Sequence, residues 1–82
     1  MAYKIKLSKD AEKFLQKQPP KQQARIIDAI FKLPYIGDIK IMKGHSNLYR
    51  LRVGAYRIIY SVENDQLTVY VLEIGNRGDI YK

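Results

Sequence analysis

The chain contains no cysteine and no tryptophan, and only one histidine. Without cysteine, a disulfide scaffold, a thiolate metal site and a cysteine nucleophile are excluded, and a single histidine leaves little for a zinc site. No apolar run approaches the roughly 20 residues that a membrane span needs, and the first residues alternate instead of forming a signal-peptide core. We therefore expect a soluble protein of a reducing compartment, most simply the cytoplasm, with no membrane partner and no small-molecule cofactor.

Acidic residues are missing from the middle of the chain. The whole sequence carries 15 lysines and arginines against 8 acids, a net charge of +7, yet no acid lies between Asp38 and Glu63. This pattern indicates either an ordinary solvated basic face or an anion-binding surface, for which nucleic acid is the usual polyanion. The interval holds His45 and the cations Lys40, Lys43, Arg50, Arg52 and Arg57.

The spacing of apolar residues predicts the secondary structure. A length of 82 residues allows one domain, spanning 1–82. Ser8 is a candidate N-cap for a first helix, and Pro19-Pro20 ends that helix. Residues 35–46 show no clear period and are expected to form a loop. The predicted order is a strand at 3–7, helices at about 9–18 and 20–33, and strands at about 48–53, 55–62 and 66–74.

The pair Gly54-Ala55 has the Gly-X pattern of a type II′ hairpin turn. A two-residue loop there places Arg52 opposite Arg57, and the side chains of both strands then separate into an apolar face and a polar face. A slip of one residue would destroy this separation, so the register is well specified. The polar face then carries Arg50, Arg52, Ala55, Arg57, Ile59 and Ser61.

The order β-α-α-β-β-β predicts a small α+β domain. We expect a two-helix hairpin packed on one face of a small, largely antiparallel sheet, with a basic open face on the other side. The neighbour of the first strand is not determined by the sequence. A second two-residue loop at Asn64-Asp65 would leave Glu73 on the apolar side, near a sheet edge.

The arginines of the polar face are the candidate anion-binding residues. Like charges directly opposite each other destabilise a sheet by up to about 1 kcal/mol, and neither hairpin strand contains an acid. A bound phosphate would explain the arrangement, because arginine binds phosphate bidentately and stays charged. The alternative is structural, with the arginine stems covering apolar residues such as Ile59.

Two segments resemble the toxins of the RelE/ParE superfamily of type II toxin–antitoxin systems. They are 48–60, LYRLRVGAYRIIY, and 71–81, VLEIGNRGDIY. For the RelE-like branch, the resemblance implies ribosome-dependent, metal-independent cleavage of mRNA through attack by the ribose 2′-hydroxyl. It also implies three partners: a cognate antitoxin, the ribosome and mRNA.

The resemblance also implies the residues of the site. Arg57 and Arg52 would clamp the phosphate, Arg50 would position the backbone, Arg77 would stabilise the leaving oxygen, and Tyr81 would orient the nucleotide. The catalytic set is thus Arg50, Arg52, Arg57, Arg77 and Tyr81, and the RNA-binding set is Lys43, Arg50, Arg52 and Arg57.

No general base is evident in the sequence. The family can carry lysine where Arg50 and Arg52 stand, and arginine gives up its proton too reluctantly to act as a base. The glutamate-and-histidine variant of the family is absent. His45 is a candidate acid or base, although a lone loop histidine is more often passive. A gyrase-inhibiting ParE-like toxin, a non-catalytic RNA-binding domain and an inactive toxin therefore remain open.

Overall fold

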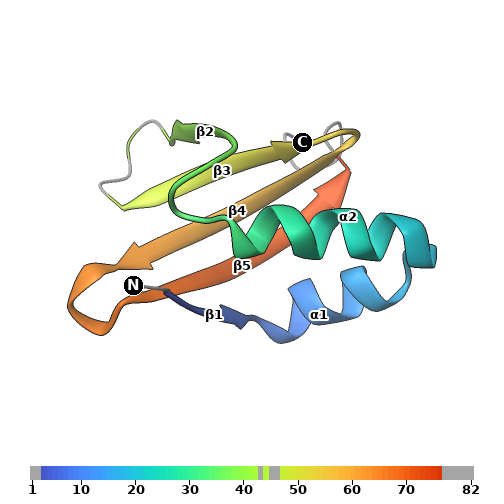
Figure 1. Ribbon diagram of the computed structural model, residues 1–82, viewed down its shortest axis with the longest axis horizontal. Helices are drawn as coiled ribbons and strands as arrows, with labels where there is room; N and C mark the ends of the chain where they lie inside the picture. The colour runs from blue at the N-terminus through green and yellow to red at the C-terminus, as the bar shows by residue number, and fades with distance from the viewer. Residues whose placement is uncertain (1–2, 43, 45–46, 77–82) are drawn as a thin grey trace.

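The structure is a computed structural model, and it describes residues 3–42, 44 and 47–76. Both helices lie on one face of a single sheet (Figure 1). The sheet has the strand order β1-β5-β4-β3-β2. The elements are β1 (Lys4–Leu7), α1 (Lys9–Gln16), α2 (Pro20–Phe31), β2 (Asp38–Ile41), β3 (Leu48–Val53), β4 (Tyr56–Glu63), a 3₁₀ turn (Asn64–Gln66) and β5 (Thr68–Asn76).

The predicted fold class is confirmed. β1 pairs in parallel with β5, which supplies the neighbour that the sequence left undetermined, and the remaining pairs are antiparallel. The core lies between the sheet and the helices, where apolar side chains of both layers exclude water. Its most buried members are Ala11, Ile26, Ile30, Leu33, Leu51, Ile58, Tyr60, Val69 and Val71.

The helical hairpin is fixed at its ends by polar contacts. The Ser8 hydroxyl accepts a hydrogen bond from the Ala11 N–H at 3.1 Å, which confirms the predicted N-cap. α1 ends slightly earlier than predicted, at Gln16, and Pro20 begins α2, where its missing N–H costs nothing. The connecting residue Gln18 accepts a hydrogen bond from the Tyr56 hydroxyl at 3.0 Å, which ties the hairpin to the sheet.

The register around Gly54 is as predicted. Val53 pairs with Tyr56 and Arg52 with Arg57. Gly54 has a φ of +56° and Ala55 has no positive φ, which agrees with a type II′ turn. The separation into apolar and polar faces is therefore real.

The prediction of a loop over 35–46 is wrong in part, because it contains β2. This strand pairs antiparallel with β3, with Ile39 opposite Leu51. It is only four residues long and lies at the sheet edge. An alternation that short gives little signal in the sequence.

The predicted two-residue loop at Asn64-Asp65 is also wrong. Glu63 pairs with Thr68, so four residues connect β4 to β5, and the last of them, Leu67, has a left-handed φ of +48°. Because this loop is two residues longer than predicted, the strand alternation beyond it is unchanged.

A β-bulge in β5 changes the position of Glu73. Tyr60 pairs with Val71, but the adjacent Ile59 pairs with Glu73, so Leu72 is an extra residue in β5. A bulge reverses the alternation beyond it. Glu73 therefore lies on the polar face, and its predicted place on the apolar side is wrong.

Candidate phosphate-binding site

Three arginines share the face of the sheet that lies away from the helices. Arg50 and Arg52 occupy alternate positions of β3, and Arg57 lies opposite Arg52 on β4. Their strand neighbours Leu51 and Ile58 belong to the core on the other side. We call the surface formed by Arg50, Arg52 and Arg57 the arginine face; its predicted composition is confirmed.

The prediction that this face is open to water is wrong for one of the three. Arg57, on the central strand β4, is only 1% exposed. Arg50 and Arg52 are half-buried. Ile59, opposite Arg50, is 7% exposed although it faces away from the helices. The stem of Arg50 is placed to shield this apolar residue, as the structural alternative predicted.

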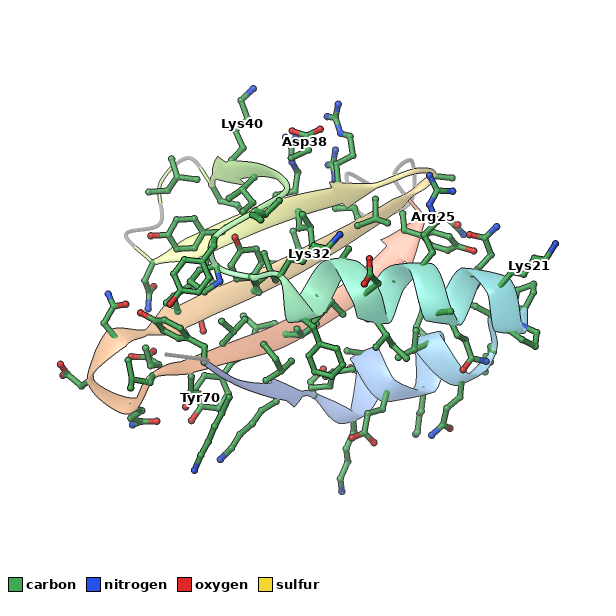
Figure 2. The ribbon with its side chains drawn as sticks, in the orientation of Figure 1. Lys21, Arg25, Lys32, Asp38, Lys40 and Tyr70 are labelled. Atoms are coloured by element: carbon green, nitrogen blue, oxygen red, sulfur yellow. The ribbon has the colours of Figure 1, made fainter. Side chains whose placement is uncertain are left out.

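An acidic side chain reaches this face from the neighbouring strand β2, although neither hairpin strand contains an acid. Asp38 on β2 lies opposite Arg52, and its Oδ2 is 4.0 Å from the Arg52 Nε. The Arg52 and Asp38 side chains are 34% and 60% exposed, and such a pair contributes at most about 1 kcal/mol. Asp38 and Lys40 extend outward at the β2 edge (Figure 2). A phosphate could therefore displace Asp38 from Arg52 at low cost.

Lysines from the two edge strands widen the positive surface beyond the three arginines. Lys40 lies opposite Arg50. On β1, Lys6 pairs with Tyr70, and its Nζ lies 5.7 Å from the centre of that ring. Tyr70 lies below the sheet in Figure 2. Only the strand order reveals this extension, because these lysines come from the two edge strands.

Part of the predicted site falls outside the described residues. Lys43, His45, Arg77 and Tyr81 belong to this part, so their roles stay predictions. Among the described residues, no group of three or more metal-ligating side chains could hold a metal ion. In the same part of the chain, neither helix is long and apolar enough to cross a membrane.

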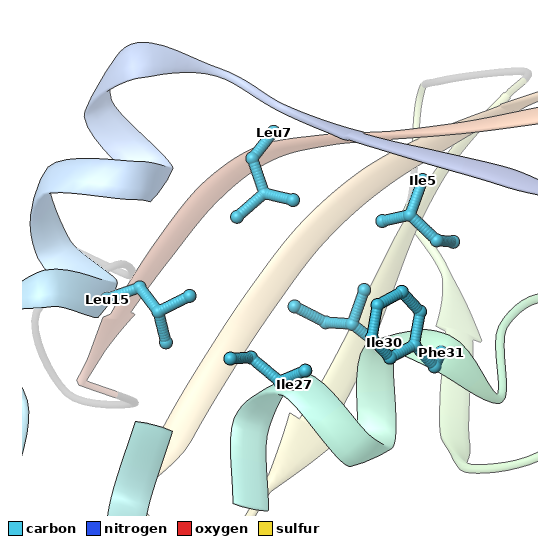
Figure 3. Close-up of a pocket in the computed structure, with 6 residues that line it drawn as sticks. All are labelled: Ile5, Leu7, Leu15, Ile27, Ile30 and Phe31. Carbon is cyan, nitrogen blue, oxygen red and sulfur yellow. The ribbon is translucent and has the colours of Figure 1, made fainter. Parts of the chain in front are cut away.

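A hollow of about 220 Å³ lies on the helix side of the sheet (Figure 3). Only aliphatic and aromatic side chains line it, so it offers no group for proton transfer or phosphate binding. It is formed by Ile5, Leu7, Leu15, Ile27, Ile30 and Phe31.

A stacked tyrosine pair lies on the core face of the hairpin. The Tyr49 and Tyr60 rings are 5.4 Å apart. Burial, with a smaller repulsion from Tyr49, raises the pKa of Tyr60 to about 12. Tyr60 therefore stays neutral at physiological pH and lies on the opposite side of the sheet from the arginine face.

Comparisons with known proteins identify the family. Residues 5–81 match the family model of the ParE toxin of the type II toxin–antitoxin system parDE. The chain is 26% identical to toxin RelG of Mycobacterium tuberculosis, covering 100% of this chain and 99% of RelG. It is 30% identical to the putative toxin RelE1 of Methanocaldococcus jannaschii, covering 100% and 98%.

Solved structures agree with this assignment. The archaeal RelE–RelB complex from Pyrococcus horikoshii gives a TM-score of 0.81 at 31% identity, covering 95% of this chain and 98% of that one. The RelB–RelE complex from Methanococcus jannaschii gives 0.76 at 33% identity, covering 93% and 94%. The chain therefore belongs to the ParE toxin family. The membership of the RelE/ParE superfamily of type II toxin–antitoxin toxins that its sequence predicted is confirmed.

Proposed function

We propose that this toxin is a metal-independent endoribonuclease that cleaves mRNA on the ribosome, in the cytoplasm. The observation that carries the proposal is the register that gathers Arg50, Arg52 and Arg57 on one face of the sheet. Lys6 and Lys40 extend this positive surface to both edges. The similarity to RelE and RelG toxins supports the RNA-cleaving branch.

In the proposed reaction, a ribose 2′-oxygen attacks the neighbouring phosphorus, giving a 2′,3′-cyclic phosphate and a 5′-hydroxyl. The pentacoordinate transition state gains negative charge, which fixed guanidinium groups stabilise. Arg52 and Arg50, which are half-buried, contact the phosphate, and Asp38 gives way to it. Arg57 is 1% exposed. It therefore does not contact the phosphate directly but stabilises its negative charge from within the sheet.

Three further residues keep their proposed roles. Arg77 stabilises the leaving 5′-oxygen, Tyr81 orients the nucleotide, and Lys43 binds the RNA backbone. The ribosome holds the mRNA in line for attack, a positioning effect that is worth several kcal/mol.

Single-turnover cleavage of mRNA on programmed ribosomes tests the proposal. Arg52→Ala is expected to lose about 2–4 kcal/mol of transition-state stabilisation. The control is Lys21→Ala, which removes an exposed cation from the first turn of α2, away from the arginine face (Figure 2), and is expected to leave the rate unchanged. Equal rates for wild type and Arg52→Ala would contradict the phosphate-binding role.

We infer that a cognate antitoxin is the protein partner. RelE toxins of the same superfamily form complexes with RelB in the structures that this chain resembles. An acidic segment would complement the arginine face, and apolar side chains would fill the hollow beside Phe31, which is 68% exposed. Loss of antitoxin capture in Phe31→Glu, with growth arrest unchanged, is the expected result.

Inhibition of DNA gyrase is the second candidate function. The matching family model, that of the ParE toxin, favours it. A supercoiling assay with purified gyrase, run beside the ribosome assay, decides between the two. If the toxin inhibits supercoiling and breaks no mRNA, gyrase inhibition would replace RNA cleavage as the proposed function.

A further inference from the structure

The β-bulge at Leu72 brings a carboxylate to the arginine face. We propose that Glu73 is the general base of the cleavage reaction and accepts the proton of the attacking 2′-hydroxyl. This inference rests on the proposed nuclease function and deepens it, because the arginines of the site cannot serve as bases.

The position of Glu73 follows from the strand register. It lies opposite Ile59, which in turn lies opposite Arg50. Arg57 pairs with Gly75, two residues from Glu73 on β5, which makes Glu73 its diagonal neighbour at about 7–8 Å between backbones. A phosphate bound over these arginines is therefore within reach of the glutamate side chain.

The carboxylate is available for proton transfer. Glu73 is exposed, and its carboxylate makes no hydrogen bond or ion pair with the other described residues. Asp38 lies on the edge strand β2, beyond Arg52 on the side away from Arg57. Glu63 lies on the same face but six residues from Arg57 along β4, a distance of about 20 Å. Glu73 is therefore the acid best placed to act.

Hydrogen bonds from the start of α1 hold the bulge in place. The Ser8 hydroxyl donates to the Leu72 carbonyl at 2.8 Å, and the Ser8 N–H donates to the Val71 carbonyl at 2.9 Å. The same hydroxyl caps α1. The orientation of Glu73 is thus anchored to the helix layer on the other side of the sheet.

In the proposed step, the Glu73 carboxylate takes the proton of the 2′-hydroxyl as the 2′-oxygen forms its bond to phosphorus. The phosphorus–O5′ bond breaks, and the leaving 5′-oxygen takes a proton from water. The glutamic acid returns its proton to solvent, so the net reaction consumes no other reagent.

The test measures single-turnover cleavage on programmed ribosomes across pH for wild type, Glu73→Gln and Glu63→Gln. Glu73→Gln is expected to slow cleavage by about 10²-fold or more and to lose the decline in rate at low pH. Glu63→Gln makes the same chemical change on the same face and is expected to match the wild type. Thermal melting of the two variants confirms that both are folded.

The outcomes separate this inference from the function beneath it. A normal rate in Glu73→Gln overturns the inference alone, and so does a slower rate with an unchanged pH profile, which would mark a positioning role. A wild type that breaks no mRNA overturns the proposed function and the inference together.

Discussion

At the scale of single residues, the central observation is an arginine at 1% exposure in the middle of the sheet. Taking a cation out of water costs several kcal/mol unless its surroundings compensate. A surface built only for solubility would not place Arg57 there. The position suits a guanidinium group that is held in place while the phosphate gains negative charge in the proposed transition state.

The buried position predicts different costs for the same substitution at two paired sites. Arg57→Lys keeps the charge but loses the planar guanidinium and places a more strongly hydrated group in the sheet. We expect it to lower the free energy of unfolding by about 1–3 kcal/mol. Arg52→Lys, at the half-buried partner position, is expected to cost less than about 1 kcal/mol. Equal midpoints of urea unfolding for Arg57→Lys and Arg52→Lys would contradict this prediction.

Tyr60 predicts a loss of stability at high pH. Its folded pKa is about 12, against 10 for an ordinary tyrosine. Below pH 10 the Tyr60 hydroxyl keeps its proton in both the folded and the unfolded chain, so its full contribution to stability is present. Between pH 10 and about 12 only the unfolded chain ionises, so stability falls by roughly 2–3 kcal/mol. Urea unfolding of Tyr60→Phe should show a correspondingly smaller decline than the wild type, and parallel curves would refute the assignment.

At the scale of elements, Ser8 connects α1 to the bulge in β5. It accepts from the Ala11 N–H and donates to the Leu72 carbonyl. Ser8→Ala removes both contacts and is expected to cost about 1–2 kcal/mol. Because the bulge orients Glu73, the variant should also cleave mRNA more slowly at a temperature where it remains folded. Ser8→Thr keeps the hydroxyl and serves as the control, and a wild-type rate in Ser8→Ala would show that the bulge holds without it.

The elements also show which parts of the structure could be predicted from the sequence. The hairpin register was predictable because Gly54-Ala55 fixes the turn and the alternation on both sides has one consistent solution. The strand Asp38–Ile41 was missed because four residues at an edge carry little periodic signal. The place of Glu73 was missed because one extra residue, Leu72, reverses the alternation without any glycine or proline to mark it.

The candidate site shows the same limit. The sequence could assign Arg50, Arg52 and Arg57 to one face, because that depends on alternation alone. It could not show that Arg57 is buried or that Asp38 lies opposite Arg52, because both depend on which strands become neighbours. Side-chain burial and cross-strand charge are properties of the assembled sheet.

At the scale of the whole molecule, the two faces of the sheet differ in role: one packs against the helices, and the other is the proposed phosphate-binding surface. The helices and the core occupy one face, and the arginine face occupies the other. In the proposed function, the net charge of +7 draws a polyanion toward the protein, and the arginine face holds it.

This division predicts the salt dependence of RNA binding. For single-stranded RNA, each phosphate contact contributes about −0.7 to the slope of log affinity against log salt. Arg52→Ala is therefore expected to make the slope shallower by about 0.7, whereas Lys21→Ala at the start of α2 should leave it unchanged. Fluorescence titrations at several salt concentrations measure both slopes, and identical changes in the two variants would show that only overall charge matters.

The pairing of β1 with β5 has a consequence for how this toxin is made. Because β5 lies between β1 and β4, the first strand to be synthesised has no partner until the last has been made, and non-local pairing of this kind is slow. While β5 is still inside the exit tunnel, Glu73 is absent from the surface that carries Arg50 and Arg57. The nascent chain therefore brings Glu73 beside the arginine face only once β5 has left the exit tunnel and paired with β4.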